Sequence, residues 1–173
     1  MQYVVLIILF MLSGFFMKYS DDFFDVNDDL KYATIFGILC GIASAAATIY
    51  SNEAAYIFIA ILVGNLIAFK VDGMHHIVTL ILFIGIVLIF GIPKLSMVVL
   101  LICILAALGD EVGHELIPNV TQNMFLNLFF EYRFVMKVVI LLLAVCGVFN
   151  LWIFVCFISF EIAYELAKVV FEN

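Results

Sequence analysis

The sequence has few charged residues and very few basic ones. Charged side chains make up 12% of the 173 residues, and only seven residues are Lys or Arg. A soluble domain averages about 25% charged residues, and nucleic-acid-binding proteins present basic patches. The composition therefore argues against a nucleic-acid-binding function and against a water-soluble fold. The net charge of −7 indicates instead that the acids bind cations.

The chain also has no close pair of cysteines. Cys40, Cys103, Cys146 and Cys156 lie far apart in apolar stretches, without a C-x-x-C spacing. This pattern excludes a zinc finger and a disulfide framework, and it predicts small buried hydrophobic side chains. Met1-Gln2-Tyr3-Val4 contains no basic residue, and no small-residue cleavage site follows. We therefore expect a first spanning helix there rather than a signal peptide.

Apolar residues dominate the sequence. Hydrophobic residues make up 68% of the chain, and the mean hydropathy is +1.31. A water-soluble core cannot absorb so much apolar surface, so we expect an all-α polytopic membrane protein with a single domain over residues 1–173. Seven spans are predicted from the apolar stretches. They lie at about Gln2–Met17, Tyr32–Tyr50, Ala54–Phe69, His76–Ile92, Leu95–Gly109, Phe134–Phe149 and Leu151–Val170.

The basic residues predict how these spans are oriented. With seven spans, the loops after the first, third and fifth spans share a face with the C-terminus. That face has six basic residues, whereas the opposite face has only Lys94. By the positive-inside rule, the first face is cytoplasmic and the N-terminus lies outside the cell membrane. The six residues are Lys18, Lys31, Lys70, Arg133, Lys137 and Lys168.

Five carboxylates lie within nine residues, from Asp21 to Asp29, directly after the first apolar stretch. Acids crowded at the end of a membrane helix repel one another unless cations gather there. If the helix continues through this run, Asp22, Asp25 and Asp29 share one helical face. Carboxylates so placed can provide oxygen ligands to Mg²⁺. A solvated acidic loop is the alternative.

A second acidic cluster, Gly109–Glu115, follows the fifth apolar stretch. It allows two pairs with i,i+4 spacing, Asp110 with His114 and Glu111 with Glu115. The predicted topology puts both clusters on the cytoplasmic face. We expect them to meet at the mouth of one cavity, where they would bind divalent metal and a phosphorylated lipid.

Two histidines, His75 and His76, open the fourth predicted helix on the same face, beside Asp72. Either one, together with His114 and a carboxylate, would suit zinc. Histidines at helix ends are more often polar caps, and this alternative stays open. Asp72-Gly73 also lacks the rest of the D-G-x-x-A-R signature of alcohol phosphatidyltransferases.

Glu161 lies near the middle of the last predicted span. A carboxylate inside the membrane indicates a functional site by default. It could line an acceptor pocket or accept a proton, or it could form a hydrogen bond to a neighbouring helix through Asn65 or a backbone carbonyl.

The stretch Leu116–Tyr132 is less apolar than the predicted spans on either side of it. Within it, Met124–Phe130 is either a lid along the interface or a connecting loop.

The run Asp21-Asp22-Phe23-Phe24-Asp25-Val26-Asn27-Asp28-Asp29 resembles the first aspartate motif of the UbiA-type intramembrane prenyltransferases, N-D-x-x-D-x-x-x-D. Asp22, Asp25 and Asp29 match the three aspartates, and Asp21 replaces the asparagine. That family has a second motif, D-x-x-x-D, four helices later on the same side. Here Glu111 and Glu115 have that spacing, with glutamates in place of aspartates. By this resemblance the seven spans correspond to family helices two to eight.

The resemblance implies a UbiA-like bundle with Mg²⁺-dependent prenyltransferase activity. Two Mg²⁺ or Mn²⁺ ions would hold the diphosphate of a polyprenyl donor. Its departure would leave an allylic cation for a lipophilic acceptor to attack. Lys31, Lys70 and Arg133 would help to neutralise the diphosphate. The expected metal ligands are Asp22, Asp25, Asp29, Asp110, Glu111, His114 and Glu115, and the first three, with Glu161, are the expected catalytic residues.

Two other classes of function stay open. Ala107-Leu108-Gly109-Asp110 approaches the G-x-G-D pattern of intramembrane aspartyl proteases, with Asp22 as the second aspartate. A cation transporter or channel, or a non-enzymatic membrane subunit, could also use the acidic face. Transporters bind their ions near the membrane midplane, where Asn65 and Glu161 are the candidates.

Overall fold

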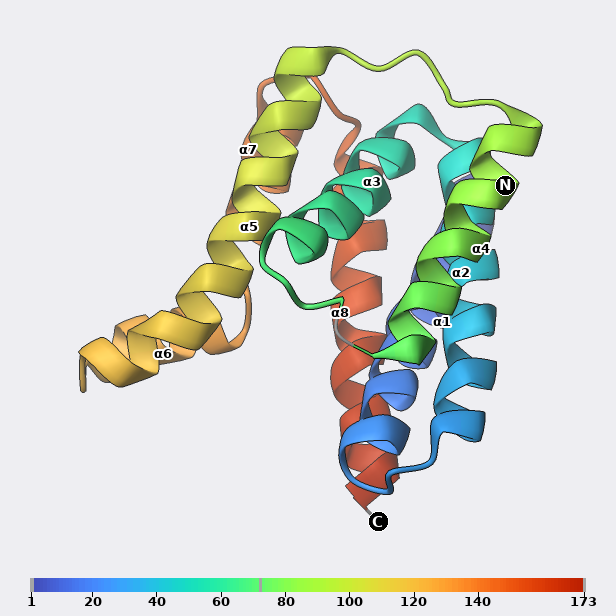
Figure 1. Cartoon of the computed structure of the whole chain (residues 1–173). Helices are drawn as coiled ribbons and strands as arrows, with labels where there is room; N and C mark the ends of the chain where they lie inside the picture. The colour runs from blue at the N-terminus through green and yellow to red at the C-terminus, as the bar shows by residue number, and fades with distance from the viewer. Residues whose placement is uncertain (1, 72, 173) are drawn as a thin grey trace.

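A computed structural model describes residues 2–71 and 73–172 of the chain. These residues form eight α-helices and no strand (Figure 1), which confirms the all-α expectation for this part of the chain. Asp72, which precedes the two histidines in the sequence, lies outside the described residues. The helices are α1 (Gln2–Asp25), α2 (Leu30–Tyr50), α3 (Asn52–Ile67), α4 (Met74–Phe90), α5 (Met97–Val120), α6 (Met124–Glu131), α7 (Phe134–Val145) and α8 (Leu151–Glu172).

Among the described residues, three helices are long and apolar enough to cross a membrane. They are α1, α2 and α5, with 24, 21 and 24 residues. At 1.5 Å per residue, 24 residues extend about 36 Å, against about 30 Å for the hydrocarbon core of a bilayer. The apolar helices α3, α4 and α7 are shorter. Large hydrophobic side chains are exposed along the bundle, as in an integral membrane protein.

The second acidic cluster and the Asp21–Asp25 part of the first are helical, because α1 and α5 continue beyond their apolar stretches. The sequence predicted that the first helix ends at Met17 and the fifth at Gly109, but α1 ends at Asp25 and α5 at Val120. Acidic residues reduce hydropathy without breaking a helix, since they have neither the entropic cost of Gly nor the steric clash of Pro. Hydropathy therefore marked the end of the apolar surface and not the end of the helix.

Six of the helices pack in a closed ring. Helix α1 packs between α2 and α8, α2 packs against α3 and α4, and α3 packs against α5. Helix α5 packs against α7, which closes the ring by packing against α8. The contact between α1 and α8 needs a glycine, because a Cβ at Gly14 would lie 2.2 Å from the carbonyl oxygen of Phe160.

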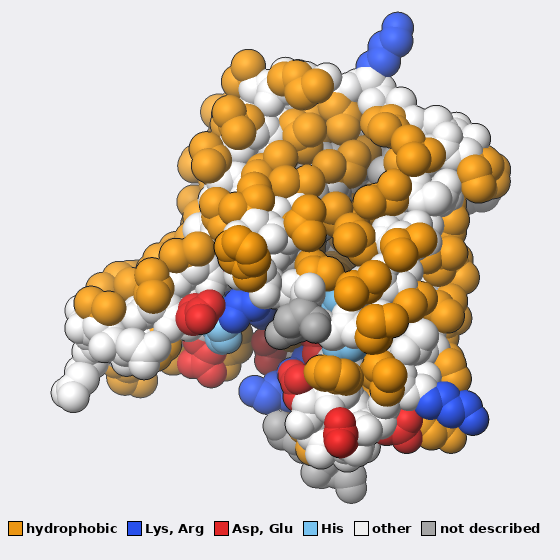
Figure 2. All heavy atoms as spheres, in the orientation of Figure 1, with side chains coloured by type: hydrophobic (Ala, Val, Ile, Leu, Met, Phe, Trp, Pro, Cys, Tyr) orange, Lys and Arg blue, Asp and Glu red, His pale blue; other side chains and the backbone are white. Residues whose placement is uncertain are grey.

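One end of the molecule holds most of the charge on the face shown in Figure 2. Charged side chains gather there at the lower end, and hydrophobic side chains cover most of the remaining surface. Helix α1 ends at this lower end (Figure 1). Helix α6 extends away from the bundle at the end of α5 and has no buried residue. The segment expected to be a lid or a loop is therefore a short exposed helix.

Candidate functional site

A cavity of about 420 Å³ between the helices brings the two acidic clusters together. Asp21 and Asp25 line it from α1, and Asp110, Glu111 and His114 line it from α5. The clusters thus share one cavity, as the topology predicts. The cavity is also lined by apolar side chains, which include Phe58, Leu62, Phe83, Met136, Phe157 and Phe160.

In the first cluster, the acids that line this cavity are not the expected three. Asp21 and Asp25 line it, one helical turn apart on α1. Asp22 lines a different pocket, and its Oδ1 lies 2.9 Å from Nζ of Lys18. Asp29 lies beyond the end of α1, so the expectation that Asp22, Asp25 and Asp29 share a helical face is wrong.

Asp29 has a local structural role, as the N-cap of α2. Its Oδ1 accepts hydrogen bonds from the backbone N–H groups of Lys31 (3.1 Å) and Tyr32 (3.2 Å). Asp is among the residues preferred at this position because its oxygen satisfies otherwise unpaired donors. Lys31 is exposed in the first turn of α2 and does not line the cavity.

Asp110 holds the start of α7 in place. Its Oδ1 accepts a hydrogen bond from Val135 N (2.8 Å), and its Oδ2 accepts one from Met136 N (2.7 Å). Helix α7 has no cap of its own, because the N-cap residue Arg133 makes no side-chain cap bond. A carboxylate on α5 therefore satisfies two donors of α7. Asp110 and Asp22 line separate pockets, so the structure does not join them as a protease dyad.

The other acids of the second cluster have basic partners. Glu111 Oε1 accepts a hydrogen bond from Nε of Arg133 at 2.9 Å, and Glu115 Oε2 lies 3.1 Å from Nζ of Lys70. Burial alone would lower the pKa of Arg133, but Tyr164 and Glu111 raise it overall, so the guanidinium stays charged. Glu115 is exposed and does not line the cavity, whereas Lys70 and Arg133 do.

Glu161 bonds to a neighbouring helix, as one of its two interpretations predicted, but through an unexpected partner. Nζ of Lys137 on α7 donates to its Oε2 at 2.8 Å; Asn65 is not the partner. Glu161 also lines the cavity. The pair is largely buried, with 11% and 17% of the two side chains exposed. A charged pair therefore crosses the α7–α8 contact at the cavity wall.

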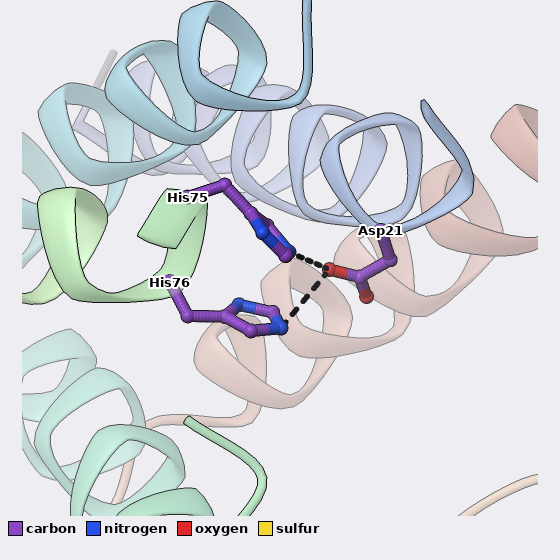
Figure 3. A group of neighbouring side chains, drawn as sticks. All are labelled: Asp21, His75 and His76. Carbon is purple, nitrogen blue, oxygen red and sulfur yellow. Dashed lines mark ion pairs between the residues drawn. The ribbon is translucent and has the colours of Figure 1, made fainter. Parts of the chain in front are cut away.

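A group of three residues stands at the wall formed by α1 and α4. His75 and His76 point toward Asp21 (Figure 3), and their Nε2 atoms lie 3.9 and 3.8 Å from its Oδ1. The three possible ligand atoms lie within 4.8 Å of one another. The sequence predicted a zinc site that joins either histidine with His114 and a carboxylate. The contact of both histidines with Asp21 was not predicted, since nothing in the sequence fixes which side of α1 faces α4.

The chain matches no protein-family model, no curated protein and no solved structure.

Proposed function

We propose that this chain is a membrane-embedded enzyme that transfers a prenyl group from a polyprenyl diphosphate to a lipophilic acceptor. The observation that carries the proposal is the cavity, which is lined both by charged groups and by aromatic side chains. A polyprenyl diphosphate likewise combines an anionic head with an apolar chain. The proposal includes seven crossing helices, an N-terminus outside and a cytoplasmic cavity mouth, in line with the positive-inside count.

The diphosphate would lie beside Lys70 and Arg133. Both residues line the cavity, and each is already paired with a carboxylate on α5. A diphosphate carries more charge than one carboxylate, and it accepts the same forked hydrogen bonds from Arg. Donor binding would therefore exchange Glu111 and Glu115 for phosphate oxygens.

The donor set for Mg²⁺ fits the first cluster better than the second. Mg²⁺ prefers oxygen ligands, keeps several waters and bridges to phosphate. Asp25 is exposed, lines the cavity and makes no ion pair with any described residue. Asp21, one turn earlier, has a second oxygen that points away from the histidines (Figure 3). These two residues would hold the ion, and the bound ion would neutralise charge that develops on the leaving diphosphate.

The remaining steps depend on the apolar wall. When the bond between the allylic carbon and the diphosphate oxygen breaks, its electron pair leaves with the diphosphate. Phe83, Phe157 and Phe160 line the cavity and would stabilise the resulting cation through their ring faces. The acceptor would then form the new bond and lose a proton. Glu161 is the proposed base, oriented by Lys137.

The test uses the full chain in lipid nanodiscs with labelled prenyl diphosphates, Mg²⁺ and a panel of lipophilic acceptors. We expect a labelled product that requires Mg²⁺ and is lost in Asp25→Asn. The matched control is Asp28→Asn, which removes the same charge three residues later in a turn that does not line the cavity. Asn also tolerates the positive φ of 51° at that position. Full activity in Asp25→Asn, or equal losses in both variants, would refute the proposal.

A further inference from the structure

We propose that Asp21, His75 and His76 form a binding site for one divalent transition metal, zinc foremost, at the wall between α1 and α4. The site does not depend on prenyl transfer. Its ligands are two imidazoles and one carboxylate, with the three ligand atoms within 4.8 Å of one another. Around tetrahedral Zn²⁺, ligand atoms lie about 3.3 Å apart, given bonds of about 2.0–2.2 Å. Shifts of roughly 0.5–1.5 Å would bring the three atoms to that spacing.

The two histidines converge although consecutive helical residues normally point in different directions. They open α4, where the helix begins after Gly73. A Cβ at Gly73 would lie 2.4 Å from Cε1 of His75, so the glycine leaves space for that ring. The His75 ring, 1% exposed, packs between Phe24 and His76, with ring centroids 4.5 and 3.9 Å away. Packing thus fixes one ligand before any metal binds.

The carboxylate provides a second, independent observation. Oδ1 of Asp21 is buried and accepts no hydrogen bond from any described residue. Burying a carboxylate oxygen without a donor is unfavourable, and a metal ion bound at this oxygen would remove that cost. The direction of Oδ1 toward both Nε2 atoms (Figure 3) places the ion among the three side chains.

The type of ligand decides the type of metal. Imidazole nitrogens suit zinc, copper, iron and nickel, whereas Mg²⁺ prefers oxygen ligands. The N-terminus of α4 opposes a cation, an effect that changes affinity by about two- to thirtyfold. Asp21 and His76 line the cavity, so a position not taken by protein faces the cavity. Water or an anionic oxygen, such as a phosphate oxygen, would occupy it.

The experiment measures metal binding to the full chain in detergent, without any prenyl substrate. Zn²⁺ content is measured after dialysis, and Co²⁺ is titrated as a visible probe in a large excess of Mg²⁺. We expect one Zn²⁺ per chain, and Co²⁺ absorption that is typical of mixed nitrogen and oxygen ligands. Mg²⁺ should not compete, because it binds imidazole poorly. A content well below one, or displacement by Mg²⁺ at similar concentration, would overturn the assignment.

Variants then identify the ligands. His76→Ala and Asp21→Asn should each weaken Co²⁺ binding more than about 100-fold, since even partners behind the ligands are worth 10–100-fold. His76 is preferred to the buried His75 because its side chain is 31% exposed and its loss disturbs packing less. The matched control is His114→Ala, a histidine on the same cavity but outside the group. Unchanged binding in His76→Ala, or equal losses in His76→Ala and His114→Ala, would refute the site.

The two proposals fail separately. If the chain binds Zn²⁺ but transfers no prenyl group, the metal site is supported and the proposed function is refuted. If it shows Mg²⁺-dependent transfer but binds no stoichiometric Zn²⁺, the proposed function is supported and the metal site is refuted.

Discussion

Replacing Asp110 by Ala should destabilise the bundle, because it removes the cap of α7. The first N–H groups of a helix have no partner within the helix. The residue before α7, Arg133, has left-handed backbone (φ 48°) and makes no side-chain cap bond. Asp110, 2% exposed on α5, instead accepts from the N–H groups of Val135 and Met136. The variant would leave both donors unpaired.

The size of the effect follows from these two bonds. A hydrogen bond to a charged group contributes about 1.5–3 kcal/mol, and replacing a capping residue by Ala costs about 0.5–2 kcal/mol. Because the two bonds share one carboxylate, we expect a loss of roughly 2–4 kcal/mol for Asp110→Ala. For a chain of this length, 1 kcal/mol corresponds to about 2–4 °C in Tm, so the Tm should fall by about 4–16 °C. Asp110→Asn keeps one accepting oxygen, so its Tm should lie between those of the wild type and Asp110→Ala.

The assay is thermal unfolding of the full chain in one detergent, followed by helical circular dichroism with and without Mg²⁺. Glu115→Ala is the control, since Glu115 lies on the same helix but is 61% exposed beside Lys70. Such an exposed pair is worth about 0–1 kcal/mol. Equal Tm values for Asp110→Ala and Glu115→Ala would show that the capping argument is wrong. A difference that appears only with Mg²⁺ would assign Asp110 to a metal site instead.

Three further results are expected. Gly14→Ala should cost about 1–3 kcal/mol of stability because α1 and α8 touch there, while Gly85→Ala, with nothing within 4 Å of the new Cβ, should be neutral or stabilising in the same melts. Lys137→Met should cost about 2–4 kcal/mol by leaving the Glu161 carboxylate without its partner, and the double variant with Glu161→Gln should recover most of this loss; no recovery would contradict the pairing. Mg²⁺ at about 100 times its Kd should raise the free energy of unfolding of the wild type by about 2.7 kcal/mol and leave that of Asp25→Asn unchanged. An equal increase in both proteins would exclude Asp25 as a ligand.

The helices were largely predictable from the sequence, but their ends were not. Each of the seven apolar stretches corresponds to a helix, because apolar length is a local property that any window reveals. The ends of α1 and α5 were missed, since helical hydrogen bonding continues into residues that are no longer apolar. The short helix α6 lay within the stretch where a lid and a loop could not be distinguished.

The cavity was predicted in outline, and the roles of its carboxylates were not. Topology alone places both acidic clusters at one end of the bundle. Which acids face the cavity depends on the rotation of each helix, and that rotation is set by packing elsewhere, such as the contact at Gly14. Asp29 and Asp110 look like metal ligands in the sequence, but they cap helices. The first capping role follows a local preference for Asp, whereas the second joins residues 25 positions apart.

The two sides of the cavity therefore have different chemistry. On the α5 side, Asp110 is satisfied by backbone donors, and Glu111 and Glu115 are paired with Arg133 and Lys70. On the α1 side, Asp25 makes no ion pair with a described residue. A cation gains most where acids lack partners, and an anion gains most where it can replace a carboxylate at an existing cation. Metal should thus bind against α1 and α4, and phosphate against Lys70 and Arg133, so that a metal-bound phosphate would bridge the two walls.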